Sequence, residues 1–235
     1  MMGVIEPEQS PAPISMEQEQ ALAAESEAAP REEEVIAEGT AEAVTGVIVL
    51  EEGPALTNET LRDWLKRWCA GDREGLPHIS TWITNKVTDF SNLFEDQSEF
   101  NDDIGTWDTS SATTMKEMFW SASAFNHPIS DWRVDKVTDM RRMFNNASSF
   151  NQPLSDWRVD KVTDMSWMFS GASSFDQPLG AWRVVVTDMS RMFEGSAFDQ
   201  DLSNWSLRHD CNTERMFDES FQNSRPVKKP CCAIS

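Results

Sequence analysis

A repeat of about 25 residues constrains this chain more than any other feature of its sequence. The stretch from Phe150 to Phe169 contains the whole pattern, and closely similar stretches precede and follow it. A fixed period of this length, held by several residue types at once, is typical of proteins that stack one small unit on the next. The aromatic positions of the repeat, which we predict to form its core, are Trp82, Trp107, Trp132, Trp157, Trp182 and Trp205, with Phe119, Phe144, Phe169 and Phe193.

Each repeat predicts one short helix followed by one short extended piece. Apolar residues between Val137 and Ala147 recur at helical spacing, and the Asn-Gln-Pro segment after Phe150 ends the helix because proline lacks an N–H group. Trp157 and Val159 then alternate as a strand requires. We therefore predict a solenoid of about six repeats over residues 76–221, in which each rung buries its aromatic residues against the next.

The segments before the repeats differ from them in composition. Residues 1–55 contain thirteen Glu, a single basic residue (Arg31) and no aromatic residue, so we predict a disordered acidic tail. Residues 56–75 contain an apolar stripe at helical spacing and are predicted to be an N-terminal capping helix that covers the first rung. Packing of the stripe into the core is favoured over a ligand-binding box of tryptophans. The stripe consists of Leu61, Trp64, Leu65 and Trp68.

The C-terminal residues 222–235 predict a flexible basic tail that ends in a lipidation signal. Cys232-Ala233-Ile234-Ser235 is a CaaX box of the farnesyl type, which predicts prenylation of Cys232. One isoprenoid gives only marginal membrane binding, so a second signal is expected. The candidates are Cys231 for palmitoylation and the basic residues Arg225, Lys228 and Lys229 for contact with anionic lipid. A chance tetrapeptide on a disordered tail is the alternative.

Charge and motifs argue against several classes of function. Forty acidic residues against twenty basic ones disfavour nucleic acid as a partner. No nucleophile–base pair, phosphate loop or metal-ligand cluster stands out, so we predict a protein that is not an enzyme and has no cofactor. Repeated carboxylates suggest calcium, but each follows a threonine at a predicted helix start, and capping explains them better. These carboxylates are Asp139, Asp164 and Asp188, with Asp89 in the first repeat.

Two tryptophans break the repeat and are the candidate partner contacts. Trp120 and Trp167 occupy positions that are polar in the sister repeats, so we predict that both indoles are exposed. Exposed tryptophan is a common anchor of protein interfaces. The alternative is that both rings only cover the flank of the stack.

The string Phe-Asn-Gln-Pro-Leu-Ser-x-Trp-x-Val-x-x-Val-Thr-Asp-Met-Ser-x-Met-Phe-x-x-Ala resembles the BspA-like leucine-rich-repeat-type surface protein family. The match covers residues 79–221. The resemblance implies a leucine-rich-repeat-like solenoid used for adhesion or protein contacts, with no catalytic residues to carry over. Bacterial relatives are typically secreted, whereas this chain shows no export signal and no apolar run long enough to span a bilayer.

These features together predict a non-enzymatic protein-interaction scaffold. We expect it in the cytoplasm, tethered to the inner face of a membrane through the prenylated C-terminus. Two alternatives stay open. One is a surface or adhesion module that is exported by an unconventional route, and the other is a soluble cytosolic binding protein without a lipid anchor.

Overall fold

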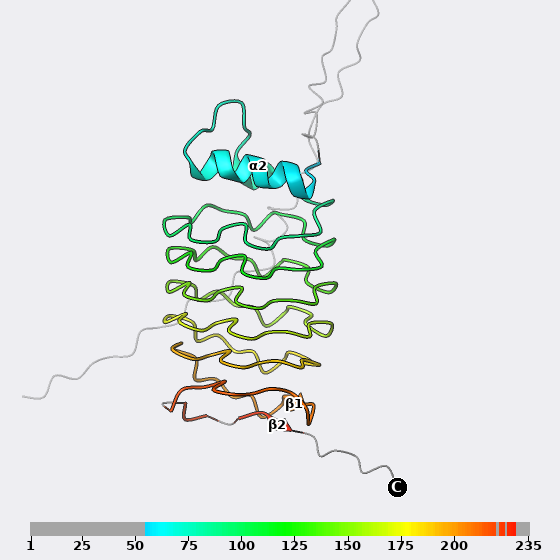
Figure 1. The fold of residues 1–235 in the computed structure, drawn as a ribbon, viewed down its shortest axis with the longest axis vertical. Helices are drawn as coiled ribbons and strands as arrows, with labels where there is room; N and C mark the ends of the chain where they lie inside the picture. Colours follow the sequence, from blue (N-terminus) through cyan, green and yellow to red (C-terminus); the bar gives the residue numbers. More distant parts are fainter. Residues whose placement is uncertain (1–54, 220, 224, 229–235) are drawn as a thin grey trace, which may run out of the picture. The chain divides into compact units, whose positions relative to one another are not determined.

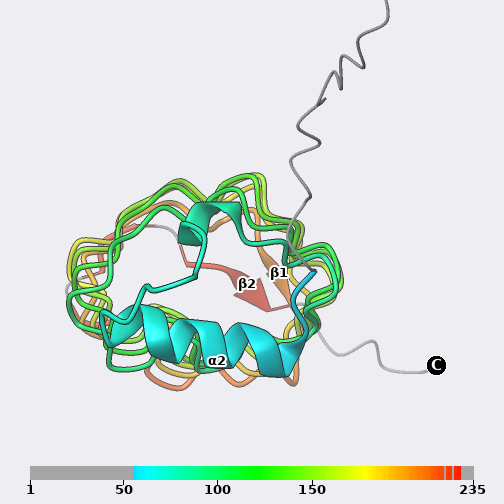
Figure 2. The same cartoon turned by 90° about the horizontal axis from the view of Figure 1, so that it is seen from above.

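The repeats form coils that stack on one another (Figure 1). Viewed down the stack, successive coils superimpose and outline a ring (Figure 2). The computed structural model describes residues 55–219, 221–223 and 225–228. These residues contain the helix α2 (Asn58–Cys69), the 3-10 helix η1 (Ile79–Thr81) and the strands β1 (Ser206–Leu207) and β2 (Val227–Lys228). The two strands pair in parallel, with Ser206 opposite Val227.

The predicted fold class, a leucine-rich-repeat-like solenoid whose rungs each contain a short helix and a short strand, is wrong. Within the described residues α2 is the only α-helix, and β1 and β2 form the only strand pair. The coils consist of consecutive turns instead. One parallel bridge lies between each pair of neighbouring coils, such as that between Asp139 and Asp164, and further backbone hydrogen bonds at every second residue join the coils after it.

The segment Met140 to Ala147 explains why helical spacing does not produce a helix here. Arg142 and Asn146 have φ angles of 54° and 58°, in the left-handed region, and a left-handed residue interrupts an α-helix. The N–H groups of Arg142, Phe144 and Asn146 donate to carbonyls of the next coil. Those of Met143, Asn145 and Ala147 donate to the carbonyl three residues before. This run of turns buries the same apolar side chains that a helix would bury: Met140, Met143, Phe144 and Ala147.

Columns of aromatic side chains hold the coils together. The ring of Phe144 stacks between those of Phe119 and Phe169, at centroid distances of 5.4 and 5.5 Å. The indole N–H of Trp157 donates to the carbonyl of Ile129 in the preceding coil at 3.1 Å. Burying one such side chain removes roughly 150–250 Å² from water, about 4–6 kcal/mol before entropic costs. Short coils without regular secondary structure thus obtain their stability from side-chain stacking.

Helix α2 lies across the first coil and replaces the coil that is missing there (Figure 1). In the coils that follow, the carbonyls equivalent to those of Asp89 and Ser91 accept N–H groups of the preceding coil. In the first coil the guanidinium of Arg62 donates to the carbonyls of Ser91 and Asp89 at 2.8 and 3.5 Å. A capping box at Thr57 fixes the start of the helix. Trp64 and Trp68 pack edge-on against Trp82, at 5.2 and 5.8 Å.

Segment 225–228 crosses the other end of the stack. The guanidinium of Arg225 lies 5.2 Å from the ring of Phe217 and 5.7 Å from that of Phe221, so it covers the last members of two phenylalanine columns. The ammonium of Lys228 donates to the carbonyl of Cys211 at 2.9 Å. Among the described residues no helix is both long and apolar enough to cross a bilayer.

Candidate interaction surfaces

Trp120, Arg142, Trp167 and Arg191 form a row of alternating rings and cations on one flank, which we call the Trp–Arg surface. The guanidinium of Arg142 lies between the two indoles, 5.5 Å from the Trp120 ring centre and 5.6 Å from that of Trp167. Arg191 lies on Trp167 at 4.6 Å. Guanidinium groups at these distances attract the ring faces, so the row is held in place by cation–π contacts.

Two glutamates fix the cations of this surface. Glu117 accepts from Arg142 at 3.4 Å and from the side-chain amide of Asn92 at 3.0 Å. Burial opposes the ionisation of Glu117, but the Asn92 amide and the charge of Lys116 outweigh it, so the pKa of Glu117 lies below its usual value of 4.5. At the other end of the row, Glu194 accepts from Arg191 at 3.1 Å.

The two indoles are half-buried, whereas their positions in the repeat predicted exposed side chains. The neighbouring guanidinium groups cover part of each ring. Trp167 has a φ of 61°, close to the 54° and 56° of Arg142 and Arg191, which occupy the same position in the adjacent coils. The backbone of this position is therefore set by the coil and not by the tryptophan.

The other residues singled out in the sequence lie as follows. All ten aromatic residues predicted as repeat core are buried. Asp164 and Asp188 do not cap helices, because each accepts the N–H group two residues later in a turn, at 2.8 Å. Within residues 55–228, as far as they are described, no group of three or more His, Cys, Asp or Glu side chains has a metal-site arrangement. Arg225 and Lys228 contact the last coils as described above. Lys229, Cys231, Cys232 and nearly all of the acidic tail lie outside the described residues.

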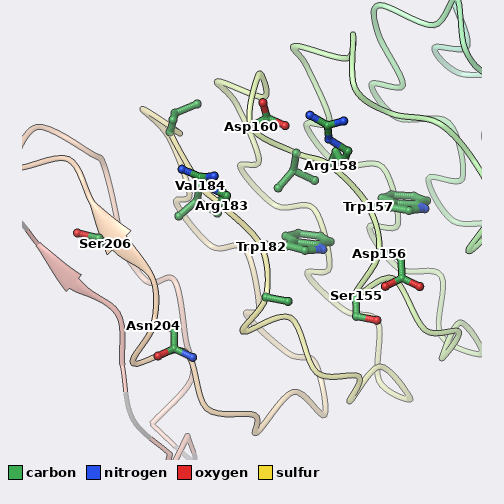
Figure 3. A pocket seen from close by; sticks show the side chains of 13 residues that line it. Ser155, Asp156, Trp157, Arg158, Asp160, Trp182, Arg183, Val184, Asn204 and Ser206 are labelled. Carbon is green, nitrogen blue, oxygen red and sulfur yellow. The ribbon is translucent and has the colours of Figure 1, made fainter.

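A groove of about 810 Å³, which was not predicted from the sequence, crosses the coils of Trp157, Trp182 and Trp205. Figure 3 shows the side chains that line it, among them Arg158 and Arg183. The groove lies where one segment of the repeat is a residue shorter than in the preceding coil. Val162 follows Trp157 by five positions, whereas Val186 follows Trp182 by four. The turn that the longer coil closes from Val162 N–H to the Val159 carbonyl, at 3.0 Å, has no counterpart in the shorter one. The missing residue between Trp182 and Val186 is the feature of the sequence that could have indicated the groove.

Comparison with known proteins places the chain in a family. A family model described as a Mycoplasma protein of unknown function, DUF285, matches residues 70–182 and, in an overlapping segment, residues 131–229. No curated protein and no solved structure matches the chain. The two segments extend over residues 70–229 of the 235 in the chain, which is more than half of its length. The chain therefore belongs to the DUF285 family.

Proposed function

We propose that this protein is a non-enzymatic interaction scaffold that binds a partner protein through the Trp–Arg surface. The observation that carries the proposal is the placement of two indoles and two guanidinium groups in one row, at positions that are polar in the sister coils. Tryptophan and arginine contribute most of the binding energy of many protein interfaces. Because these side chains are already held by their neighbours, little conformational entropy is lost when a partner binds.

Membership of the DUF285 family and the repeat string together support a closer relation to the BspA-like surface proteins. We propose that the chain shares with that group the use of its repeats for protein contacts. The stacked coils offer a rigid surface on which a few substituted positions determine what is bound.

The two tryptophans can be replaced by residues that the fold already accepts at the same positions. Trp120→Asn introduces the residue at position 145, and Trp167→Arg introduces the residue at positions 142 and 191. We expect the double variant to fold like the wild type and to bind at least tenfold more weakly to the partner that is recovered with the full chain from its host. Quantitative co-purification followed by titration with the purified partner measures this effect.

Arg133→Ala is the matched control, because Arg133 is an exposed side chain outside the Trp–Arg surface. It should leave partner binding unchanged. Equal recovery of the same partner with the wild type and the double variant would refute the proposed surface. A change in the circular dichroism or in the unfolding midpoint of the double variant would show damage to the coils.

The proposed scaffold is tethered to a membrane through prenylated Cys232, with Cys231 as the palmitoylation candidate. This part rests on the sequence of residues 231–235. Prenylation predicts that the protein from its host lacks the last three residues and carries an isoprenoid mass. An intact, unmodified C-terminus ending in Ile234-Ser235 would refute it. Labelling of intact cells tests the alternative of a module at the cell surface.

A further inference from the structure

Arg183, which lines the groove, lacks the acidic residues that the arginines of the preceding coils have two positions before and after them. In two successive coils an arginine follows the repeat tryptophan and has an acidic residue on either side of it in the outward-facing positions. Arg133 pairs with Asp135 at 3.4 Å, and Arg158 is flanked in sequence by Asp156 and Asp160. In the next coil, Ala181 and Val185 occupy these two positions beside Arg183. Within the described part of the chain, neither Arg158 nor Arg183 makes an ion pair or a side-chain hydrogen bond, but only Arg158 has carboxylates two residues before and after it.

Val185 adds an apolar contact beside this cation. Its side chain is 45% exposed, an unusual state for a large aliphatic residue in a structure whose other repeat valines are mostly buried. Residues 181–186 alternate between exposed and less exposed positions, as an extended segment does. Arg183 and Val185 therefore face the groove from the same side of the chain. The polar side chains of Ser155, Asn204 and Ser206 also line the groove (Figure 3). The coil of Trp157 adds the charged side chains of Asp156, Arg158 and Asp160.

We propose that the Arg183 groove binds an extended peptide segment of a partner protein, in which a carboxylate side chain is followed two residues later by an apolar one. An extended peptide presents residues i and i+2 on one side, which matches the spacing of Arg183 and Val185. The arginine fork can bind a carboxylate with two hydrogen bonds. The groove crosses three coils, so it has room for several residues of such a segment.

The charge of the whole chain makes this inference specific. The net charge is −20, so an acidic peptide is repelled by most of the protein. Within the groove, Asp156 and Asp160 flank Arg158, so we expect the peptide carboxylate to bind at Arg183. A free anion in an open, wet groove gains little from one arginine. The apolar contact with Val185 favours a peptide over a free anion. This surface is separate from the Trp–Arg surface, and neither proposal depends on the other.

The test uses the full chain and a fluorescein-labelled hexapeptide, Gly-Glu-Gly-Val-Gly-Gly, in which the valine follows the glutamate by two residues. The same peptide with lysine in place of glutamate is the charge-reversed probe. We expect the acidic peptide to bind and the basic one not to bind to the groove. Arg183→Ala should weaken binding of the acidic peptide about tenfold, as expected for the loss of a charged hydrogen-bonded pair. Fluorescence anisotropy measures both affinities.

Two further variants distinguish the groove from general charge effects. Ala181→Asp restores the acidic residue that the adjacent coils have beside their arginine, and it should weaken binding as much as Arg183→Ala. Arg133→Ala removes an arginine that is already paired, and it should leave the affinity unchanged. Variants at Trp120 and Trp167 should also bind the peptide normally. The proposal is overturned if Arg133→Ala and Arg183→Ala have equal effects, or if the basic peptide binds as well as the acidic one.

Discussion

At the scale of single residues, the coils depend on positions with left-handed backbone geometry. One such column contains Ser121, Asn146, Gly171 and Gly195, whose φ angles lie between 57° and 72°. Glycine adopts this conformation without strain, whereas an alanine there costs roughly 1 kcal/mol or more. Ser121 and Asn146 therefore adopt this conformation at a cost in free energy, whereas Gly171 and Gly195 adopt it without strain.

Gly171 should be the most sensitive glycine of this column. A β-carbon at Gly171 would lie 2.2 Å from the side-chain oxygen of Asn146, whereas at Gly195 the nearest atom would be 3.6 Å away. We expect Gly195→Ala to cost about 1 kcal/mol of unfolding free energy and Gly171→Ala about 2 kcal/mol. Urea unfolding measures both. Addition of Asn146→Gly to Gly171→Ala should remove the difference, and equal costs of the two alanine variants would contradict this account.

Asp210 gives a titration that can be predicted at the same scale. The guanidinium of Arg208 donates two hydrogen bonds to its carboxylate, at 2.9 and 2.8 Å, and lowers the pKa of Asp210 to about 2. Arg208→Gln should return this pKa to near 3.8, the ordinary value. Carbon-13 NMR of the side-chain carboxyl group follows the titration. An unchanged pKa in the variant would show that the pair does not form in solution.

At the scale of elements, the sequence predicts what is buried more reliably than how the backbone achieves it. Apolar residues three, one and three positions apart are buried equally well by a helix and by a run of turns, so spacing alone cannot distinguish the two. Position 146 and its equivalents contain Asn or Gly in three of the coils, and this preference was the available sign of left-handed residues. In α2, by contrast, the N-cap, the charges and the apolar stripe all favour a helix.

The tryptophans of the Trp–Arg surface could be predicted from the sequence, whereas the groove was not. Trp120 and Trp167 stand out because they break a polar pattern, but their contacts with Arg142 depend on the stacking of adjacent coils. The groove follows from a missing residue, and a shorter repeat does not by itself reveal whether a turn closes or a cleft opens.

The tryptophan column offers a prediction at this scale. Trp157→Phe removes one of the two donors to the Ile129 carbonyl, which keeps the N–H group of Trp132, so we expect a loss of about 0.5–1.5 kcal/mol in unfolding free energy. Trp64→Phe on α2 is the control, because the described structure shows no hydrogen bond from its indole. Chemical denaturation should separate the two variants by about 0.5–1.5 kcal/mol. A similar loss in both would mean that ring size, and not the hydrogen bond, determines the effect.

At the scale of the whole molecule, the two ends of the stack are closed by different means. Arg62 on α2 supplies donors to the first coil, while Arg225 covers the rings of the last described one. Between these ends, the backbone hydrogen bonds from one coil to the next connect residues 23 to 26 positions apart, and the indole hydrogen bonds connect residues 26 or 28 positions apart. Because each coil contacts mainly its neighbours, its removal should leave the rest intact if the register is kept.

Deletion of residues 135–159 tests this expectation. The deletion joins Val134 to Asp160 and recreates the same local sequence, Trp-Arg-Val-Asp-Lys-Val, that both parent coils contain. The carbonyl of Asp164 then stands where that of Asp139 accepts the N–H group of Met115. We expect a folded protein with a single unfolding transition and an m-value lower by roughly a seventh, in proportion to the surface removed.

A deletion of half a coil, residues 135–146, is the matched comparison. It places Trp132 against the wrong column and leaves buried phenylalanine rings without stacking partners, so this variant should lose its cooperative transition. Circular dichroism and fluorescence during urea unfolding distinguish the two outcomes. If the half-coil deletion unfolds as cooperatively as the full-coil deletion, the stacking register does not determine the fold, and general burial of apolar residues is sufficient.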